Sequence, residues 1–186
     1  AKEKELMAKT IRHDFRHHNQ NIAALLQKGD VKEALRYVKQ YDESLKAAKP
    51  MDFCPHTTVN AILSNFLVKA RKDGISVFIS ADIPDESPIT DMDFVAILSN
   101  LLENALNGCR ECGSHGGIQV NIRTVAGKTV IVCSNPCLPD LAIENNLPKN
   151  RGTGVESILL AARKYSGDIR YELENGRLMV CIILNT

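Results

Sequence analysis

The chain has no run of apolar residues close to the about 20 that a membrane-spanning helix needs, and it shows no signal peptide. It also has almost no net charge, because 23 Lys and Arg residues against 22 Asp and Glu residues leave a formal charge of +1. This balance gives no reason to expect nucleic acid or an anionic membrane as the main partner. We therefore expect a cytoplasmic chain without membrane contact. Because it starts without Met, in Lys2-Glu3-Lys4-Glu5, we also expect a fragment whose full-length protein is anchored in the cell membrane by an N-terminal sensor region.

A disulfide framework is not expected, because a chain of 186 residues can bury a core without covalent cross-links. A zinc site is one alternative for the six cysteines, since Cys109, Cys112, Cys133 and Cys137 could supply four thiolates. However, Cys109 and Cys112 fall at the end of a predicted helix, and Cys133 lies within an apolar, strand-like run. We favour the interpretation that they are buried free thiols, which behave as small apolar side chains.

Residues 1–50 contain one glycine, Gly29, and no proline before Pro50. A first helix is predicted by positions spaced by threes and fours, namely Ile11, Phe15, His18, Ile22 and Leu25. Gly29-Asp30 separates it from a second helix over residues 31–48, whose inner face carries Leu35, Val38 and Leu45. Two helices bury too little surface alone, so the hairpin is expected to form a four-helix bundle as a homodimer.

His13 lies on the first helix, facing away from the apolar seam, and is followed by Asp14. An exposed imidazole beside a carboxylate suits a phosphoryl acceptor, because neutral imidazole attacks while the carboxylate orients it and removes its proton. The alternative is a solvated or metal-binding helix face, since His13 and His17 are four residues apart.

The remainder of the chain predicts one α+β domain with a mostly antiparallel sheet and helices on one face. Helices are predicted over residues 57–72, 90–109 and 155–165. Strands are predicted over 75–80, 118–125, 129–134, 168–173 and 177–184. Asn175-Gly176 is a strong signal for the last hairpin.

Two patterns in this domain carry chemistry. Asn100 and Asn104 place two side-chain amides one helical turn apart. Gly152 and Gly154 bound a turn that opens a helix, where backbone N–H groups can hold phosphate.

Three segments together resemble the cytoplasmic core of a bacterial sensor histidine kinase. They are Arg12-His13-Asp14, Asn100-Leu101-Leu102-Glu103-Asn104-Ala105 (the N-box) and the turn Arg151-Gly152-Thr153-Gly154-Val155. The resemblance is to kinases with a Bergerat-fold ATP-binding domain of the GHKL superfamily, in the branch of quorum-sensing peptide receptors. It implies a dimerisation and histidine phosphotransfer hairpin over residues 1–50 and a catalytic ATP-binding α/β sandwich over 51–186. It further implies autophosphorylation with ATP and Mg²⁺ and transfer to an aspartate of a response-regulator receiver domain.

The same resemblance assigns roles to single residues. His13 would be the phosphoacceptor and Asp14 its general base. Asn104 would bind Mg²⁺, which prefers hard oxygen ligands, and Asn100 would contact phosphate. Further contacts to ATP are implied for the adenine reader Asn135, the glycines Gly152 and Gly154, and the basic residues Lys149 and Arg151.

One family motif is missing. The first glycine box should follow the strand that ends at Ser134, yet the chain reads Asn135-Pro136-Cys137. The lid between Asn135 and Gly152 is also short. Two alternatives therefore stay open: a phosphotransferase that has lost ATP binding, and a dimerising adaptor without enzymatic activity.

Overall fold

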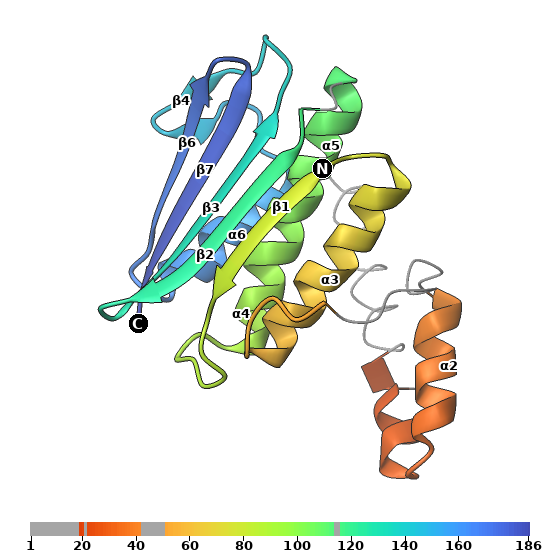
Figure 1. Ribbon diagram of the computed structural model, residues 1–186. Coiled ribbons are helices and arrows are strands. Elements are labelled where there is room, and N and C mark those ends of the chain that lie inside the picture. Colours follow the sequence, from red (N-terminus) through yellow and green to blue (C-terminus); the bar gives the residue numbers. More distant parts are fainter. Residues whose placement is uncertain (1–18, 21, 42–50, 114–115) are drawn as a thin grey trace, which may run out of the picture. The chain divides into compact units, whose positions relative to one another are not determined.

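The computed structural model describes residues 19–20, 22–41, 51–113 and 116–186 (Figure 1). The chain divides into two compact units, Ala1–Ala47 and Ala48–Thr186. The boundary predicted at residue 50 lies outside the described residues, as do His13, Asp14 and the seam positions Ile11, Phe15, His18 and Leu45. In the described part of the chain, no helix has the length and apolar character to cross a membrane.

In the first unit, the predicted junction at Gly29-Asp30 is confirmed. Gly29 has a φ of +75°, and the Asp30 N–H donates to the Leu25 carbonyl, which ends the preceding helical residues 22–27. Asp30 then caps α2 (Val31–Tyr41) by accepting the Glu33 N–H through Oδ1 at 3.1 Å. Leu35, predicted on the inner face of a dimeric bundle, is 54% exposed in the single chain, and Ala34 is buried. A face that a second copy would cover is exposed in one copy, so the predicted inner face stays a prediction.

The second unit is built on a five-stranded sheet with the order β1-β2-β3-β7-β6. Its strands are β1 (Val77–Asp82), β2 (Ile118–Val125), β3 (Lys128–Pro136), β6 (Asp168–Glu174) and β7 (Arg177–Asn185). β1 runs parallel to β2, and every other pair is antiparallel. The mostly antiparallel sheet predicted from the sequence is thus confirmed, with one parallel edge.

The first strand begins two residues later than predicted. Ile75 belongs to the C-terminal cap of the preceding helix, because its N–H donates to the Ala70 carbonyl. The Ser76 carbonyl accepts the Ile118 N–H at 2.8 Å and starts the pairing with β2. The apolar run that suggested a strand from Ile75 therefore includes part of a helix cap.

Both tight hairpins use left-handed backbone. Asn175 and Gly176 have φ values of +52° and +74°, as a two-residue type I′ turn requires. The β2–β3 turn repeats this with Ala126 at +50° and Gly127 at +71°. The predicted Asn-Gly hairpin is confirmed.

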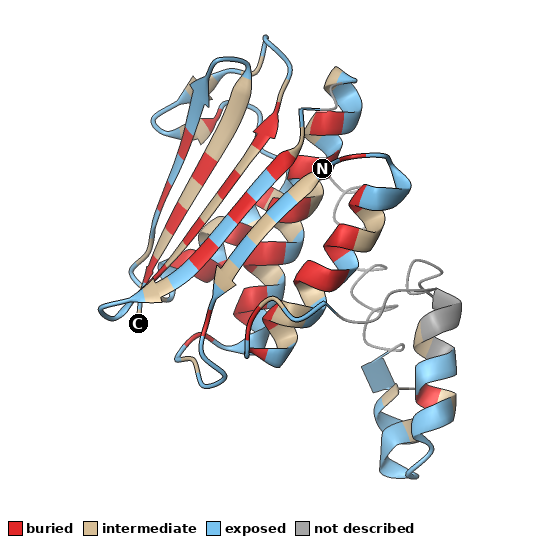
Figure 2. Cartoon of the chain, viewed as in Figure 1, coloured by how far each residue is buried: buried red, intermediate tan, exposed pale blue. Residues whose placement is uncertain are grey.

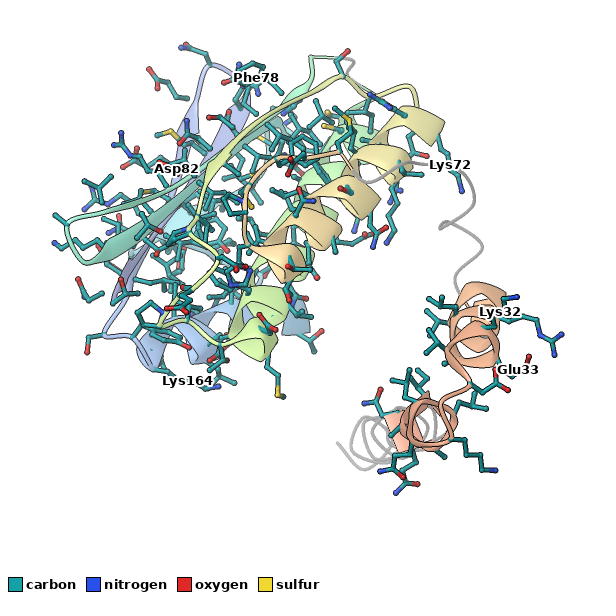
Figure 3. All side chains as sticks on the ribbon, turned by 60° about the horizontal axis from the view of Figure 1, so that its bottom comes forward. Lys32, Glu33, Lys72, Phe78, Asp82 and Lys164 are labelled. Atoms are coloured by element: carbon teal, nitrogen blue, oxygen red, sulfur yellow. The ribbon has the colours of Figure 1, made fainter. Side chains whose placement is uncertain are left out.

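All helices of the second unit cover one face of the sheet (Figure 1). They are α3 (Thr57–Lys72), α4 (Asp91–Phe94), a π-helical segment η2 (Val95–Ser99), α5 (Asn100–Cys112) and α6 (Thr153–Arg163). The strands alternate between buried and more exposed residues, and the buried ones face the helices (Figure 2). The open face of the sheet carries Phe78, which is 69% exposed and is labelled with Asp82 in Figure 3.

The long helix predicted over residues 90–109 is not a uniform α-helix. Thr90 caps it as expected, with Oγ1 accepting the Asp93 N–H at 3.2 Å. The π-helical turn Val95–Ser99 then widens it immediately before the N-box. Asn100 Nδ2 donates to the Ala96 carbonyl at 2.6 Å, which gives a carbonyl of this widened turn a partner.

A buried carboxylate joins the start of this helix to the end of α6. Asp93 accepts hydrogen bonds from Lys164 Nζ at 2.6 Å, Tyr165 Oη at 2.7 Å and Thr90 Oγ1 at 2.8 Å. Lys164 is labelled in Figure 3. Burial alone would raise the pKa of Asp93, but these hydrogen bonds and the nearby ammonium outweigh it and lower the pKa below its ordinary value.

Candidate functional site

A cavity of about 460 Å³ lies at one end of the helical layer. One wall is the face of α5 that carries Asn104, Asn107 and Gly108, and the opposite wall is the segment of residues 137–150. Asn135 of β3, Tyr171 of β6 and Leu178 of β7 contribute from the sheet. Gly152 and Val155 contribute from the start of α6.

Four of the predicted site residues line this cavity: Asn104, Asn135, Lys149 and Gly152. Asn100, Arg151 and Gly154 adjoin it without lining it. His13 and Asp14 lie outside the described residues, so their roles stay predictions.

Asn104 is exposed, and its amide makes no hydrogen bond to any described residue. The neighbouring Asn107 is held differently, because its Oδ1 accepts from Arg110 Nη1 at 2.8 Å. A free carboxamide oxygen suits a hard cation that keeps several of its own waters, as Mg²⁺ does. Asn104 therefore offers a free carboxamide oxygen to such an ion on this wall, which also carries the Glu111 carboxylate.

The cysteines supply no metal site in the described chain, where no group of three or more His, Cys, Asp or Glu side chains could hold an ion. Burial raises the pKa of the Cys133 thiol to about 12 and also raises that of Cys109. Zinc binding requires thiolates, so raised thiol pKa values oppose it. Cys109 and Cys133 are buried free thiols, as the sequence predicted, whereas Cys112 and Cys137 are free but only partly buried.

The start of α6 is open to an anion. Gly152 is its N-cap, and no side chain caps the first turn. The unpaired N–H groups and the helix dipole therefore remain available to a negatively charged group. The phosphate-binding role of the glycine turn stays a prediction, for which this helix start leaves room.

The side chain of Asn100 contacts the glycine turn at the start of α6. A Cβ on Gly154 would lie 3.0 Å from Asn100 Oδ1, so the two residues are already in close contact. Because Asn100 Nδ2 donates to the Ala96 carbonyl, the side chain is held between η2 and the glycine turn. Its contact with phosphate stays a prediction, and its observed position is against Gly154 of the turn.

Two basic side chains near the turn are paired with carboxylates. Lys149 Nζ lies 3.0 Å from Glu144 Oε1, and Arg151 Nε lies 3.4 Å from Glu156 Oε1. All four side chains are more than 40% exposed, and exposed ion pairs are worth only about 0–1 kcal/mol. Lys149 or Arg151 could therefore leave its carboxylate and pair with an anion at the start of α6 at a small cost in free energy.

Asn135 closes the inner end of the cavity. It is 3% exposed, and its Nδ2 donates to the Pro136 carbonyl at 2.7 Å. That bond fixes the orientation of the amide, because only the nitrogen can donate, and it leaves Oδ1 as an acceptor. Sequence reasoning missed Gly108, which makes room for this amide: a Cβ there would lie 2.6 Å from Asn135 Nδ2.

The predicted short lid contains a small hairpin of β4 (Ile143–Glu144) and β5 (Leu147–Pro148). Its turn residues Asn145 and Asn146 have φ values of +51° and +64°. The Asn146 carbonyl accepts the Tyr171 N–H at 2.9 Å, which attaches the hairpin to β6. The lid therefore gives the cavity an ordered wall, which its sequence did not reveal.

Known proteins resemble this chain in sequence and fold. The sensor histidine kinase NatK of Bacillus subtilis (strain 168) is 28% identical over 128 residues, which cover 66% of this chain and 38% of that protein. The chain thus spans well under half the length of this relative.

Among solved structures, the catalytic domain of the histidine kinase ThkA superposes with a TM-score of 0.57 at 18% identity, over 69% of this chain and 90% of that one. The histidine kinase AdeS of Acinetobacter baumannii gives a TM-score of 0.51 at 17% identity, over 93% of this chain and 97% of that one. At these identities, the likeness shows a shared fold.

The sequence profile of the GHKL domain matches residues 89–185, more than half of the chain. That range includes the N-box, Asn135, the lid and the glycine turn. The chain belongs to the GHKL domain family.

Proposed function

We propose that the chain is the kinase core of a sensor histidine kinase, which binds ATP with Mg²⁺ in the cavity of its second unit and phosphorylates His13. One observation carries the proposal. The cavity combines a fixed acceptor at Asn135, a free amide at Asn104 and the open N-terminus of α6. These are the three contacts that an adenine amino group, a metal-bound phosphate chain and a phosphate anion require.

The described residues fit this ligand. Asn135 Oδ1 is an acceptor, and the amino group of adenine is a donor. Asn104 would hold Mg²⁺ through its carboxamide oxygen, while the first turn of α6 would hold phosphate oxygens. Bound ATP would supply the phosphoryl group, and the residues of this chain would orient it and neutralise its charge. Phosphoryl transfer depends mainly on such positioning.

The transfer itself involves residues outside the described range. In our proposal, neutral His13 attacks the γ-phosphorus, and Asp14 takes the imidazole proton as the bond to phosphorus forms and ADP leaves. The phosphoryl group then passes from His13 to an aspartate of a response regulator. Residues 1–50 provide the homodimer, and the upstream region of the full-length protein provides a membrane-anchored sensor.

A second candidate function is a phosphotransferase or adaptor with a degenerate nucleotide site. The observation in its favour is that the first glycine box of the family is missing. In this chain, Pro136 ends β3 and pairs with Arg177. The Arg177 guanidinium fastens this strand end, because it donates to Ser134 Oγ at 3.0 Å and to the Ser134 carbonyl at 3.1 Å. The segment is thus ordered without glycine and still presents Asn135 to an open cavity, so we favour the kinase.

Two measurements on the same preparation test the proposal. Calorimetric titration with Mg²⁺ and ADP should show saturable binding that is lost when Mg²⁺ is chelated. Incubation with γ-labelled ATP and Mg²⁺ should give phosphate that is labile in acid and stable in base. Nucleotide binding without labelling would favour a site lacking transfer, whereas absence of both would support a phosphotransferase or an adaptor with a degenerate nucleotide site.

A further inference from the structure

Tyr171 contains a buried polar atom that lacks a partner. Among the buried side-chain nitrogens and oxygens of the described residues, its hydroxyl is the one without a hydrogen bond. The residue is only 4% exposed, yet it lines the cavity. Leaving a buried hydroxyl unpaired costs about 1–3 kcal/mol, so a hydroxyl retained here calls for an explanation.

The sheet register places Tyr171 on the same face as Asn135, with β7 between their two strands. Tyr171 pairs with Val180, and two residues away along β7, Leu178 pairs with Asn135 of β3. Since side chains two apart along a strand share a face, Tyr171, Leu178 and Asn135 all face the helical layer. All three line the same cavity.

The protonation state of Tyr171 defines what it can offer. Burial raises the pKa of its phenol to about 12, so the group keeps its proton throughout the neutral range. A neutral phenol can donate one hydrogen bond and accept others. Asn135 Oδ1, in contrast, can only accept.

We infer that the Tyr171 hydroxyl is a contact to the nucleobase, which works with Asn135 to select adenine. This inference rests on the proposed nucleotide function. Adenine presents an amino donor next to ring-nitrogen acceptors, which matches one acceptor and one donor in the cavity. Guanine presents a carbonyl oxygen where adenine has the amino group, so Asn135 Oδ1 would face another acceptor. A bound adenine would also give the Tyr171 hydroxyl its missing partner.

Tyr171→Phe is the decisive variant, because it removes only the hydroxyl. Calorimetry with Mg²⁺ and ADP should show affinity lowered about 3- to 10-fold, the effect of losing one hydrogen bond. Without nucleotide, the Tm should be unchanged or higher, since no intramolecular hydrogen bond is lost. The parent should bind ADP more tightly than GDP, and the ratio should fall in the variant.

Tyr165→Phe is the matched control. Its hydroxyl donates to Asp93 and accepts the Thr90 N–H at 3.0 Å, so its loss should lower the Tm and leave ADP binding unchanged. Tyr171→Phe that loses stability like Tyr165→Phe and binds ADP like the parent would overturn the contact to the base. If the parent itself binds no ADP, the proposed function is overturned and this inference with it.

Discussion

Replacing Gly108 by Ala should weaken both the fold and the nucleotide site, although Ala is the better helix former. A Cβ at this position would lie 2.6 Å from Asn135 Nδ2 and 3.1 Å from the Pro136 carbonyl oxygen, closer than the 3.4 Å at which ordinary contact begins. Asn135 cannot move aside without losing its bond to Pro136. Overpacking costs about 1–3 kcal/mol, against a gain of about 1 kcal/mol from replacing a helical glycine. The expected net loss is about 1 kcal/mol.

That loss corresponds to a Tm lower by about 2–4 °C for a chain of this size, measured by circular dichroism. Affinity for Mg²⁺-ADP should fall about 5- to 10-fold, because Asn135 is displaced from the adenine edge. The control is a double-mutant cycle with Asn135→Ala, in which Gly108→Ala should become less destabilising by at least about 0.5 kcal/mol. Unchanged Tm and affinity in Gly108→Ala, together with additive effects in the cycle, would refute the steric account.

Three further predictions concern other groups. The Asn104 side chain is exposed and makes no hydrogen bond to any described residue, so Asn104→Ala should shift the Tm by no more than about 2 °C. Loss of the proposed Mg²⁺ ligand should nevertheless abolish labelling by γ-labelled ATP, and labelling at the parent rate would remove its assigned role. His13→Gln should also abolish labelling, and label that persists there but disappears in His17→Gln would reassign the phosphoacceptor. The folded-state pKa of Asp93 is lowered, so the stability it contributes is present above its ordinary pKa of 3.8 and is lost as the pH falls through the lowered value. Urea titrations should therefore show a smaller fall in the free energy of unfolding at acid pH for Asp93→Asn than for the parent, and parallel curves would contradict this.

The sequence predicted those parts of the site whose chemistry follows from a short local pattern. Asn104 and the turn at Gly152 were found because an amide on a helix and a glycine turn before a helix have recognisable spacing. Asn135 was proposed from the resemblance to the kinase family, which places a polar residue at this point after the strand. All three line the cavity.

Other features depend on contacts between distant segments. From the sequence alone, Gly108 is a residue that lowers the stability of a helix, and only the structure shows its contact with Asn135. Tyr171 occupies an inward position on an alternating strand, where it reads as ordinary core, and only the packed structure shows that its hydroxyl is unpaired.

The π-helical turn Val95–Ser99 has a consequence for how the length of this helix can change in evolution. A π turn holds more residues than an α turn, so losing one residue there can restore regular α-helix. Such a deletion leaves the spacing among Asn100, Asn104 and Gly108 intact. A deletion between Asn100 and Asn104 would instead rotate Asn104 by about 100° relative to Asn100, and one between Asn104 and Gly108 would rotate Gly108 by the same angle relative to Asn104. Single-residue length variation is therefore compatible with function on the N-terminal side of Asn100 and incompatible with it between Asn100 and Gly108.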